Sequence, residues 1–520
     1  MQVWRLALPV MLTNFLQTLV SVVDVFMVGR LGPVAIAAVG MSNAVRLLVL
    51  VMLLAVASGA MSLIAQAKGA RDPKRMSFVT RQAISSGLLL SLLLGTVGYL
   101  LANPLLTFAN SGGEAEAVEL GTLYLQLLFL GTPFMVLNIV FNKLMQGAGD
   151  TVTPLFLTGV LNMLNIFLNY CFMFGLGPIP AFGLQGAAMG TILARFLGVL
   201  IAFMLIYSGR NVIKLLPGSY RPDWRMFRDI LSIGVPSGVQ GVFRNGSRFL
   251  AISIVTATEV GTYGAAALAI GFQVQALAFM PVLGINVAGT ALVGQALGSW
   301  QPKEARIRGG TGIWLGVAVM IVLASPILIF AEQILNLFDP SAHPILQQAG
   351  VEYIRISSLT LPFTAIAMVA NGNLRGAGDT LPGMMSTILT RGVLTVALSY
   401  LLAFPLGFGS TGVWMGIALG NGFDAFYLIW RWYGQSGKAW LKVALHKSQI
   451  YRQHLHHLPE MIQQQYLRDI RTPLMAHPTA QEHVEDKQVV YTQPDGNVTI
   501  EFSTEGYRVV EGKEMTRLAG

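Results

Sequence analysis

The sequence predicts an all-α membrane protein with twelve transmembrane helices in two six-helix lobes, followed by a cytoplasmic C-terminal tail. Of its 520 residues, 54% are hydrophobic and only 11% are charged, whereas soluble domains carry about 25% charged residues. An internal repeat also supports the prediction, because Gly147-Ala148-Gly149-Asp150-Thr151 recurs in the second half of the chain as Gly376-Ala377-Gly378-Asp379-Thr380. A duplicated membrane bundle is the usual build of a carrier with a site between two moving halves.

The repeat extends well beyond this turn. The same offset in numbering (376 − 147), or one smaller by at most three, aligns further positions: Gln66, Gly69, Pro73 and Lys74 with Gln295, Gly298, Pro302 and Lys303; Pro9 with Pro236; and Gly186 and Gly190 with Gly412 and Gly416. We therefore expect a first lobe over residues 1–207, a cytoplasmic linker over 208–228, a second lobe over 229–433 and a tail over 434–520.

Long apolar runs place the individual helices. About 20 apolar residues cross the hydrocarbon core, and such runs must be helical because lipid offers no partner to free backbone groups. We count twelve spans, at residues 6–28, 33–58, 80–102, 120–143, 153–175, 183–207, 229–257, 261–294, 309–331, 350–372, 382–404 and 409–433.

The loops between these spans alternate in charge. One set is rich in lysine and arginine, as at Lys68–Arg75 and Arg221–Arg228, and the other holds acidic residues such as Glu259 and Glu332. Basic short loops stay in the cytoplasm, so we expect a multi-pass protein of the inner cell membrane with both termini inside. The net charge of +9 then orients the bundle in the lipid bilayer and indicates no nucleic-acid partner; contact with lipid headgroups is the alternative role.

The tail after Tyr433 is more polar. Lys438–Ile470 is predicted to be a basic amphipathic helix on the inner leaflet, and its clustered histidines lack the further ligands of a metal site. Val489–Tyr491 and Val498–Phe502 flank Pro494-Asp495-Gly496, a pattern that indicates a hairpin.

Asp24 is the sharpest candidate for a functional residue. It lies deep in the first span, within Val22-Val23-Asp24-Val25-Phe26. A carboxylate at this depth is costly unless it is paired, hydrated or neutralised. It could exchange a proton between the two sides of the membrane or bind Na⁺; the alternative is a structural carboxyl that ties the first span to its neighbours.

The fifth span carries a row of asparagines. Asn162, Asn165 and Asn169 are three and four residues apart, which places them on one helix face. This face indicates either a hydrated cavity shared with Asp24 or a hydrogen-bond network between helices.

Intramembrane charges mark the second lobe. Arg244, Arg391 and Asp424 fall in the seventh, eleventh and twelfth spans, and Arg391 is the repeat equivalent of Asn162, since 391 − 162 equals 376 − 147. One interpretation is a salt bridge of Asp424 with Arg391 or Arg244; the other is an element that recognises an anion or gates the carrier. Arg46 and Arg195 are further intramembrane cations.

Several of these segments together resemble the multidrug and toxic compound extrusion (MATE) family. They are Val23-Asp24 followed by Gly29-Arg30, the repeated Gly-Ala-Gly-Asp-Thr turns, Gln66-Ala67-Lys68-Gly69 and Asn165-Ile166-Phe167-Leu168-Asn169, and the resemblance covers about residues 1–435. It implies two six-helix lobes that form a V and export drugs or metabolites in exchange for H⁺ or Na⁺. Asp24 falls on the family's cation-coupling carboxylate, and Asn165 and Asn169 fall on the polar face of its fifth helix.

The chain departs from the family pattern at three positions. One branch of the family has an aspartate where this chain has Asn169, and the multidrug branch has acidic residues close to Arg244 and Thr364. The resemblance therefore implies a cation site in the first lobe and none in the second.

We accordingly expect a monomeric secondary antiporter that exports small organic compounds, is coupled to H⁺ or Na⁺ through Asp24 and needs no other cofactor. The alternative is a flippase or exporter of an anionic or lipid-linked cargo read by the second-lobe arginines. An intramembrane enzyme is not expected, because no paired catalytic groups or metal ligands occur in the spans.

Overall fold

A computed structural model describes residues 2–109, 115–208, 211–340, 342–434, 481–484, 488–493, 496–502 and 507–511. The first half of the chain forms seven helices: α1 (Gln2–Gly29), α2 (Pro33–Gly69), α3 (Pro73–Ala109), α4 (Ala115–Leu130), α5 (Thr132–Gly147), α6 (Val152–Phe174) and α7 (Gly183–Tyr207). The predicted span 120–143 is not one helix, since α4 and α5 meet at Gly131 with a bend of 52°. Pro133 in the first turn of α5 has no N–H to continue the hydrogen bonds of α4.

The second half follows the same plan with two additions. Its elements are α8 (Trp224–Thr256), α9 (Gly261–Gly298), α10 (Pro302–Ile329), α11 (Ala331–Phe338), α12 (Pro344–Ala377), α13 (Leu381–Thr387), the π-helix η1 (Ile388–Leu394), α14 (Thr395–Ala403) and α15 (Gly409–Gly434). The short α11 was not predicted, and the predicted span 382–404 contains a π-helical segment in place of a uniform α-helix.

Nine helices of the described residues are long and apolar enough to cross a membrane, and the bent pair α4–α5 makes a tenth. The two remaining long helices, α8 and α15, are more polar and carry Arg244, Arg248 and Asp424. The protein is therefore a mostly helical, multi-pass membrane bundle.

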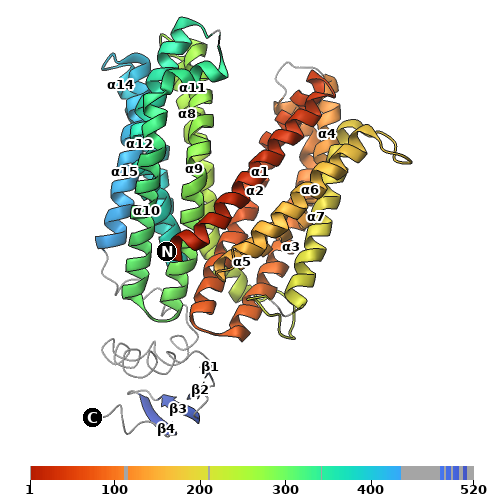
Figure 1. Ribbon diagram of the computed structural model, residues 1–520, viewed down its shortest axis with the longest axis vertical. Helices are drawn as coiled ribbons and strands as arrows, with labels where there is room; N and C mark the ends of the chain where they lie inside the picture. Colours follow the sequence, from red (N-terminus) through yellow and green to blue (C-terminus); the bar gives the residue numbers. More distant parts are fainter. Residues whose placement is uncertain are drawn as a thin grey trace.

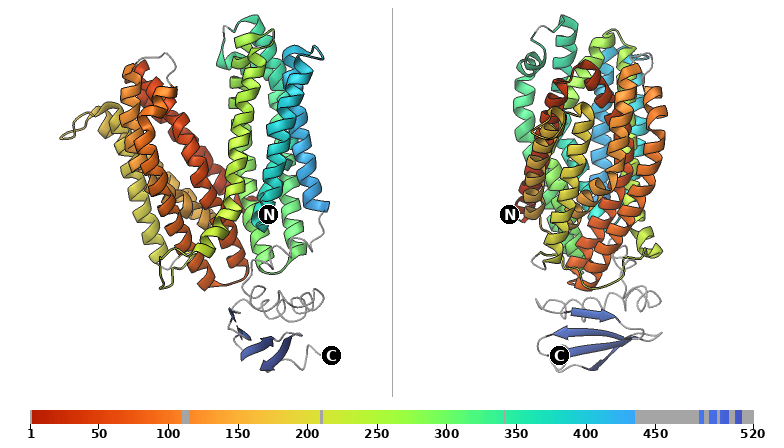
Figure 2. Two further views of the ribbon diagram at one scale, coloured as in Figure 1. Left: turned by 180° about the vertical axis from the view of Figure 1, so that it is seen from behind. Right: turned by 90° about the vertical axis from the view of Figure 1, so that its right-hand side faces the viewer.

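The helices form two groups that together make a V (Figure 1). We call α1–α7 the first lobe and α8–α15 the second lobe. The lobes converge at the end that carries the turns after α2, α5, α9 and α12, which we call the basic end, and they diverge toward the opposite end; the view from behind agrees (Figure 2).

Each lobe begins inside the other. Val3 and Ala7 of α1 belong to the hydrophobic core of the second lobe, together with Val282 and Ile285 of α9. Ile230 and Ile233 of α8 belong to the core of the first lobe. The first helix of each lobe therefore starts in the hydrophobic core of the other lobe and crosses the junction between them.

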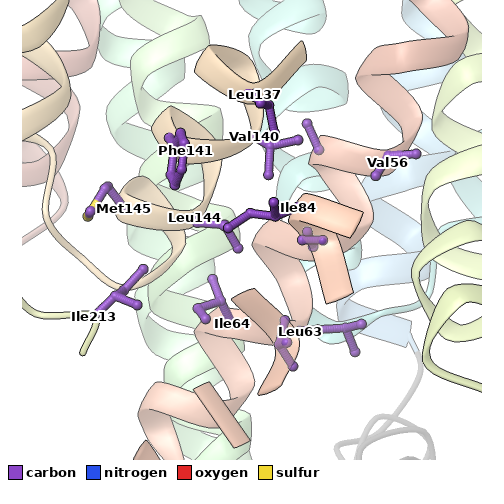
Figure 3. Packing of buried hydrophobic residues seen from close by; sticks show 14 of the residues in the cluster. Val56, Leu63, Ile64, Ile84, Leu137, Val140, Phe141, Leu144, Met145 and Ile213 are labelled. Carbon is purple, nitrogen blue, oxygen red and sulfur yellow. The ribbon is translucent and has the colours of Figure 1, made fainter. Parts of the chain in front are cut away.

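The core of the first lobe at the basic end is built from α2, α3 and α5 (Figure 3). Leu63 and Ile64 of α2 pack with Ile84 of α3, Val140, Phe141 and Leu144 of α5, and Ile213 of the linker. The linker is also tied to α3, because Gln82 donates a hydrogen bond to the carbonyl of Arg221 (2.9 Å) and accepts one from the amide of Asp223 (2.8 Å).

The described part of the tail forms an antiparallel sheet in the order β1-β2-β3-β4: β1 (Gln481–Val484), β2 (Gln488–Gln493), β3 (Gly496–Phe502) and β4 (Tyr507–Glu511). β2 and β3 pair with Gln493 opposite Gly496, and the buried Val489 lies opposite the buried Ile500. The predicted amphipathic helix Lys438–Ile470 lies outside the described residues.

Candidate functional site

The carboxylate of Asp24 joins α1 to α6. The Asn169 side-chain amide donates a hydrogen bond to Asp24 Oδ1 at 2.9 Å. Asp24 is half-buried, and it forms no ion pair with any residue that the structure describes. The structure thus brings Asp24 into contact with Asn169 of the asparagine face.

The asparagine face continues onto α7. Asn165 donates to the hydroxyl of Thr191 (3.1 Å), and the amides of Asn165 and Asn169 bond to each other at 3.4 and 3.5 Å. The close approach of α7 depends on Gly190, since a Cβ there would lie 2.4 Å from Asn169 Oδ1. Asn162 is not part of this network, and its buried Nδ2 has no hydrogen-bond partner among the described residues.

Two arginines complete the electrostatics of the first-lobe site. Arg195 on α7 and Arg46 on α2 both interact electrostatically with Asp24, and they also act on the buried Tyr124 of α4. The sequence predicts both as intramembrane cations, but their electrostatic interaction with Asp24 becomes apparent only in the fold. The site therefore holds one carboxylate and two guanidinium groups.

The second lobe holds its charges differently. Arg391 Nε lies 3.8 Å from Asp424 Oδ2, and the Ser386 hydroxyl donates to Asp424 Oδ1 at 2.5 Å. Of the two predicted salt bridges, the structure thus forms the one with Arg391. Arg244 is exposed and forms no ion pair or side-chain hydrogen bond with a described residue, so the alternative pair of Asp424 with Arg244 is wrong.

Thr364 does not join these charges through a hydrogen bond. It is buried, and its hydroxyl donates to the carbonyl of Thr360 in its own helix at 3.1 Å. Nearby, Asn421 of α15 donates to the Thr360 hydroxyl at 3.2 Å. These contacts form a neutral polar network between α12 and α15.

The basic end is closed by contacts that repeat from one lobe to the other. Gln66 of α2 donates to the carbonyl of Gly376 at the end of α12 (3.1 Å), and Gln295 of α9 donates to the carbonyl of Gly147 at the end of α5 (3.1 Å). The two donors and the two acceptors are separated by the same offset in numbering (295 − 66 and 376 − 147), so a pseudo-two-fold axis relates the two bonds. The repeat in the sequence predicts the equivalence of these residues but not their role as bridges between the lobes.

Close backbone crossings accompany these hydrogen bonds. A Cβ at Gly69 would lie 1.9 Å from the carbonyl oxygen of Gln295, and a Cβ at Gly298 would lie 2.0 Å from that of Gln66. The Gly-Ala-Gly-Asp-Thr segments form the predicted tight turns, in which Gly149 and Gly378 have φ of 87° and 79°. Arg431 pairs with Asp379 of the second turn at 3.0 Å.

Comparison with known proteins decides the family. The MatE family profile matches residues 9–171 and 236–401, one segment in each lobe. The chain belongs to the MatE family. A relative from Thermotoga maritima, described as a probable multidrug resistance protein NorM, is 32% identical over 417 residues, which cover 79% of this chain and 88% of the relative. A relative of the same description from Rhizobium meliloti is 29% identical over 438 residues, covering 82% and 92%.

Solved structures agree with the family. One, described as an outward-facing conformation of a multidrug resistance MATE family transporter, superimposes with a TM-score of 0.74 at 26% identity over 86% of this chain and 96% of that one. Another is a transporter of the MOP superfamily from Pyrococcus furiosus, described as having a binding pocket of reverse polarity, with a TM-score of 0.73 at 25% identity over 86% and 96% of the two chains. This MatE protein is thus a membrane transporter and not an enzyme, as the sequence predicts.

Proposed function

We propose that this MatE protein is a secondary antiporter that exports small organic compounds in exchange for H⁺ or Na⁺, coupled through Asp24. The single observation that carries the proposal is the setting of Asp24, whose carboxylate has no ion pair among the described residues and rests on the amide of Asn169. Such a group inside a bundle changes its energy strongly when it binds a cation. The relatives described as probable multidrug resistance proteins support the class of cargo.

The surroundings of Asp24 favour H⁺ over Na⁺. A bound sodium ion wants several oxygen ligands, whereas Asn169 presents an N–H donor to Asp24, and Arg46 and Arg195 add positive charge nearby. A proton needs only one carboxylate oxygen. No group of three or more His, Cys, Asp or Glu side chains that could hold a metal ion occurs in the part of the chain that the structure describes.

Helix α1 supplies a route from the coupling site to the other lobe. The first turns of α1 lie in the second-lobe core through Val3 and Ala7. Near the C-terminal end of α1, Asp24 binds Asn169 of α6. Protonation of Asp24 replaces a charge-assisted hydrogen bond by a neutral one of about half the strength. We infer that α1 then shifts against the Asn165 and Asn169 face, that the junction at the basic end rearranges and that the cargo is released.

We further propose that the monomer spans the inner membrane twelve times, with α8 and α15 as the two polar spans and both termini in the cytoplasm. The lysines and arginines of the basic end support this orientation. With the basic end inside, the V opens outward, like the outward-facing MATE transporter with which the chain superimposes.

Transport in proteoliposomes tests the coupling. The purified chain is reconstituted with an imposed pH or Na⁺ gradient, and export is followed for cationic, neutral and anionic dyes. Asp24→Asn is expected to abolish export driven by the gradient and the accompanying proton release. Asp424→Asn is the matched control, because it removes the intramembrane carboxylate of the other lobe and is expected to leave the coupling intact. Unchanged coupling in Asp24→Asn would refute the proposal.

A second candidate function differs in the charge of the cargo. Among the described residues, five arginines but only two carboxylates lie on the membrane-spanning helices around the two sites: Arg46, Arg195, Arg244, Arg248 and Arg391 against Asp24 and Asp424. This excess of positive charge favours an anionic cargo, free or lipid-linked, over the cationic one that the family resemblance suggests. Export of anionic dyes that is impaired by Arg391→Ala supports it; indifference of both anionic and cationic dyes to this substitution would rule it out.

A further inference from the structure

Three arginines of the second lobe, Arg244, Arg248 and Arg391, form what we call the basic cluster. Helix α8 touches η1 where Gly392 faces Phe243, since a Cβ at Gly392 would lie 2.8 Å from Phe243 Cδ1. The next residue on α8 is Arg244, and the residue before Gly392 is Arg391, and the two guanidinium groups are close enough to interact electrostatically. Arg248 lies one turn further along α8, with its guanidinium carbon 5.1 Å from the centre of the Phe272 ring.

The basic cluster has too little negative charge around it. Its one carboxylate partner among the described residues is Asp424, and this group bonds more closely to Ser386 (2.5 Å) than to Arg391 (3.8 Å). Arg244 has no partner in the described structure and is exposed. Cations at membrane depth are costly unless they are paired or hydrated, so the cluster is suited to an anion from outside the protein.

The helix that carries Arg391 is locally irregular. At the turns that precede α6 and α13, equivalent residues of the two copies differ in number by 376 − 147. Further on, Gly190 packs on Asn169 in the first lobe, and its equivalent Gly416 packs on Ser399 in the second. The difference between Asn169 and Ser399 (399 − 169) is greater by one. The second lobe therefore holds one additional residue in this stretch, and η1 accommodates it. Single π-helical turns are frequent at functional sites, and Arg391 lies in the middle of this one.

Exposed apolar surface lies beside the charges. Phe243 is partly exposed next to Arg244, and Phe272 lies beneath Arg248. Guanidinium groups bind carboxylates, sulfonates and phosphates through two parallel hydrogen bonds and also stack on aromatic rings. The surface thus combines guanidinium groups that can bind an anion with aromatic side chains beside them.

We propose that the basic cluster binds the acidic group of an aromatic organic anion and that this group replaces Asp424 as the partner of Arg391. The proposal rests on the anionic-cargo form of the proposed function and names its substrate class and its site. Asp424 then acts as an internal competitor, which holds Arg391 in place when no cargo is bound and keeps only its hydrogen bond from Ser386 when cargo arrives.

Equilibrium binding to the purified full chain tests this without any ion gradient. Fluorescein is the anionic probe and rhodamine 6G the cationic one, because both share a xanthene ring system, and fluorescence anisotropy reports binding. Arg244→Gln and Arg391→Gln are each expected to weaken fluorescein binding about tenfold or more, the effect of losing one charge-assisted contact. Asp424→Asn is expected to strengthen it several-fold, and Arg225→Gln, the same change on an exposed part of α8, to leave it unaltered.

Each outcome of these binding measurements supports or overturns a stated part of the proposal. Fluorescein affinity that is equal in all variants, or tighter binding of rhodamine 6G that the arginine substitutions do not affect, overturns the proposal. Weaker fluorescein binding in Asp424→Asn overturns the role of Asp424 as competitor. If Arg391→Gln fails to fold, Arg244→Gln still decides, because the exposed Arg244 supports no described partner. If the chain binds fluorescein but shows no gradient-driven export, the proposed antiport is refuted and the proposed binding site is retained.

Discussion

The crossing of α2 and α9 at the basic end gives a prediction whose magnitude follows from the structure. In Gly69→Ala, the new methyl group would lie 1.9 Å from the carbonyl oxygen of Gln295, whereas real Cβ contacts are essentially never below 3.0 Å. The clash is with backbone, so the two helices have to separate by about 1 Å, and overpacking of this kind costs about 1–3 kcal/mol.

The separation also weakens, by about half, the hydrogen bonds from Gln66 to Gly376 and from Gln295 to Gly147, which are worth about 1 kcal/mol each. The total of roughly 2–4 kcal/mol is the destabilisation of the closed basic end and shifts the equilibrium toward a form open at this end by a factor of about 30 to 1,000. A conformation in which α2 and α9 have moved apart would not carry this penalty.

Cysteine labelling measures the shift. Cys171 is the only cysteine and is buried. Ser62 of α2 is buried at the basic end, where its hydroxyl donates to the carbonyl of Arg375 at 2.7 Å. Ser62→Cys in a Cys171→Ala background therefore reports access to the basic end by a membrane-impermeant maleimide in inside-out vesicles. Gly69→Ala is expected to raise the labelling rate at least tenfold. Gly246→Ala is the control, because a Cβ at this mid-helix position meets no atom within 4 Å. Equal labelling and equal thermal stability of Gly69→Ala and the parent would refute the reasoning.

Three further predictions concern the basic end, the Asp24 site and the loop between α8 and α9. Gln66→Leu and Gln295→Leu are each expected to raise labelling at the basic end several-fold, and by similar factors, because the two bonds are related by the repeat; strongly unequal effects would contradict this symmetry. Asn169→Leu removes the donor to Asp24 and is expected to lower proton-coupled export about tenfold, through loss of one hydrogen bond to a charged group, whereas Asn162→Leu is expected to preserve it. Glu259 lies in the loop between α8 and α9; partial burial acts to raise its pKa, but the hydrogen bonds from Ser410 outweigh this effect and lower the pKa below the usual value. Since a lowered carboxyl pKa stabilises the fold above its unfolded-state pKa of about 4.3, the melting temperature is expected to fall more steeply below about pH 4.5 in the parent than in Glu259→Gln, and identical pH profiles would refute it.

Much of the fold could be predicted because the repeat and the apolar runs are properties of the chain itself. The matched positions Gln66 and Gln295, Gly69 and Gly298, and the two Gly-Ala-Gly-Asp-Thr turns all lie at the junction of the lobes, where both copies must meet the same constraints. The bend at Gly131 and the π-helix at Ile388–Leu394 were missed. A hydropathy pattern does not resolve a bend within an apolar run, and the single additional residue appears only when packing contacts of both lobes are compared.

The candidate site was predictable in its residues but not in its pairing. Asp24 and Asn169 were connected by their polarity and depth, and the structure joins them. The partner of Asp424 remained open between Arg244 and Arg391, because spacing along separate helices does not fix which side chains meet. The grouping of Arg46 and Arg195 around Asp24 also needed the fold, since they come from α2 and α7.

The central claim is that Asp24 couples export to an inward flow of protons. The most direct test is the proton release recorded when substrate is added to purified protein in weakly buffered detergent solution, which separates the coupling of substrate binding to Asp24 deprotonation from transport. The account predicts release of about one proton per bound substrate in the parent and in Asp424→Asn, and none in Asp24→Asn. Equal release from Asp24→Asn and the parent would contradict it.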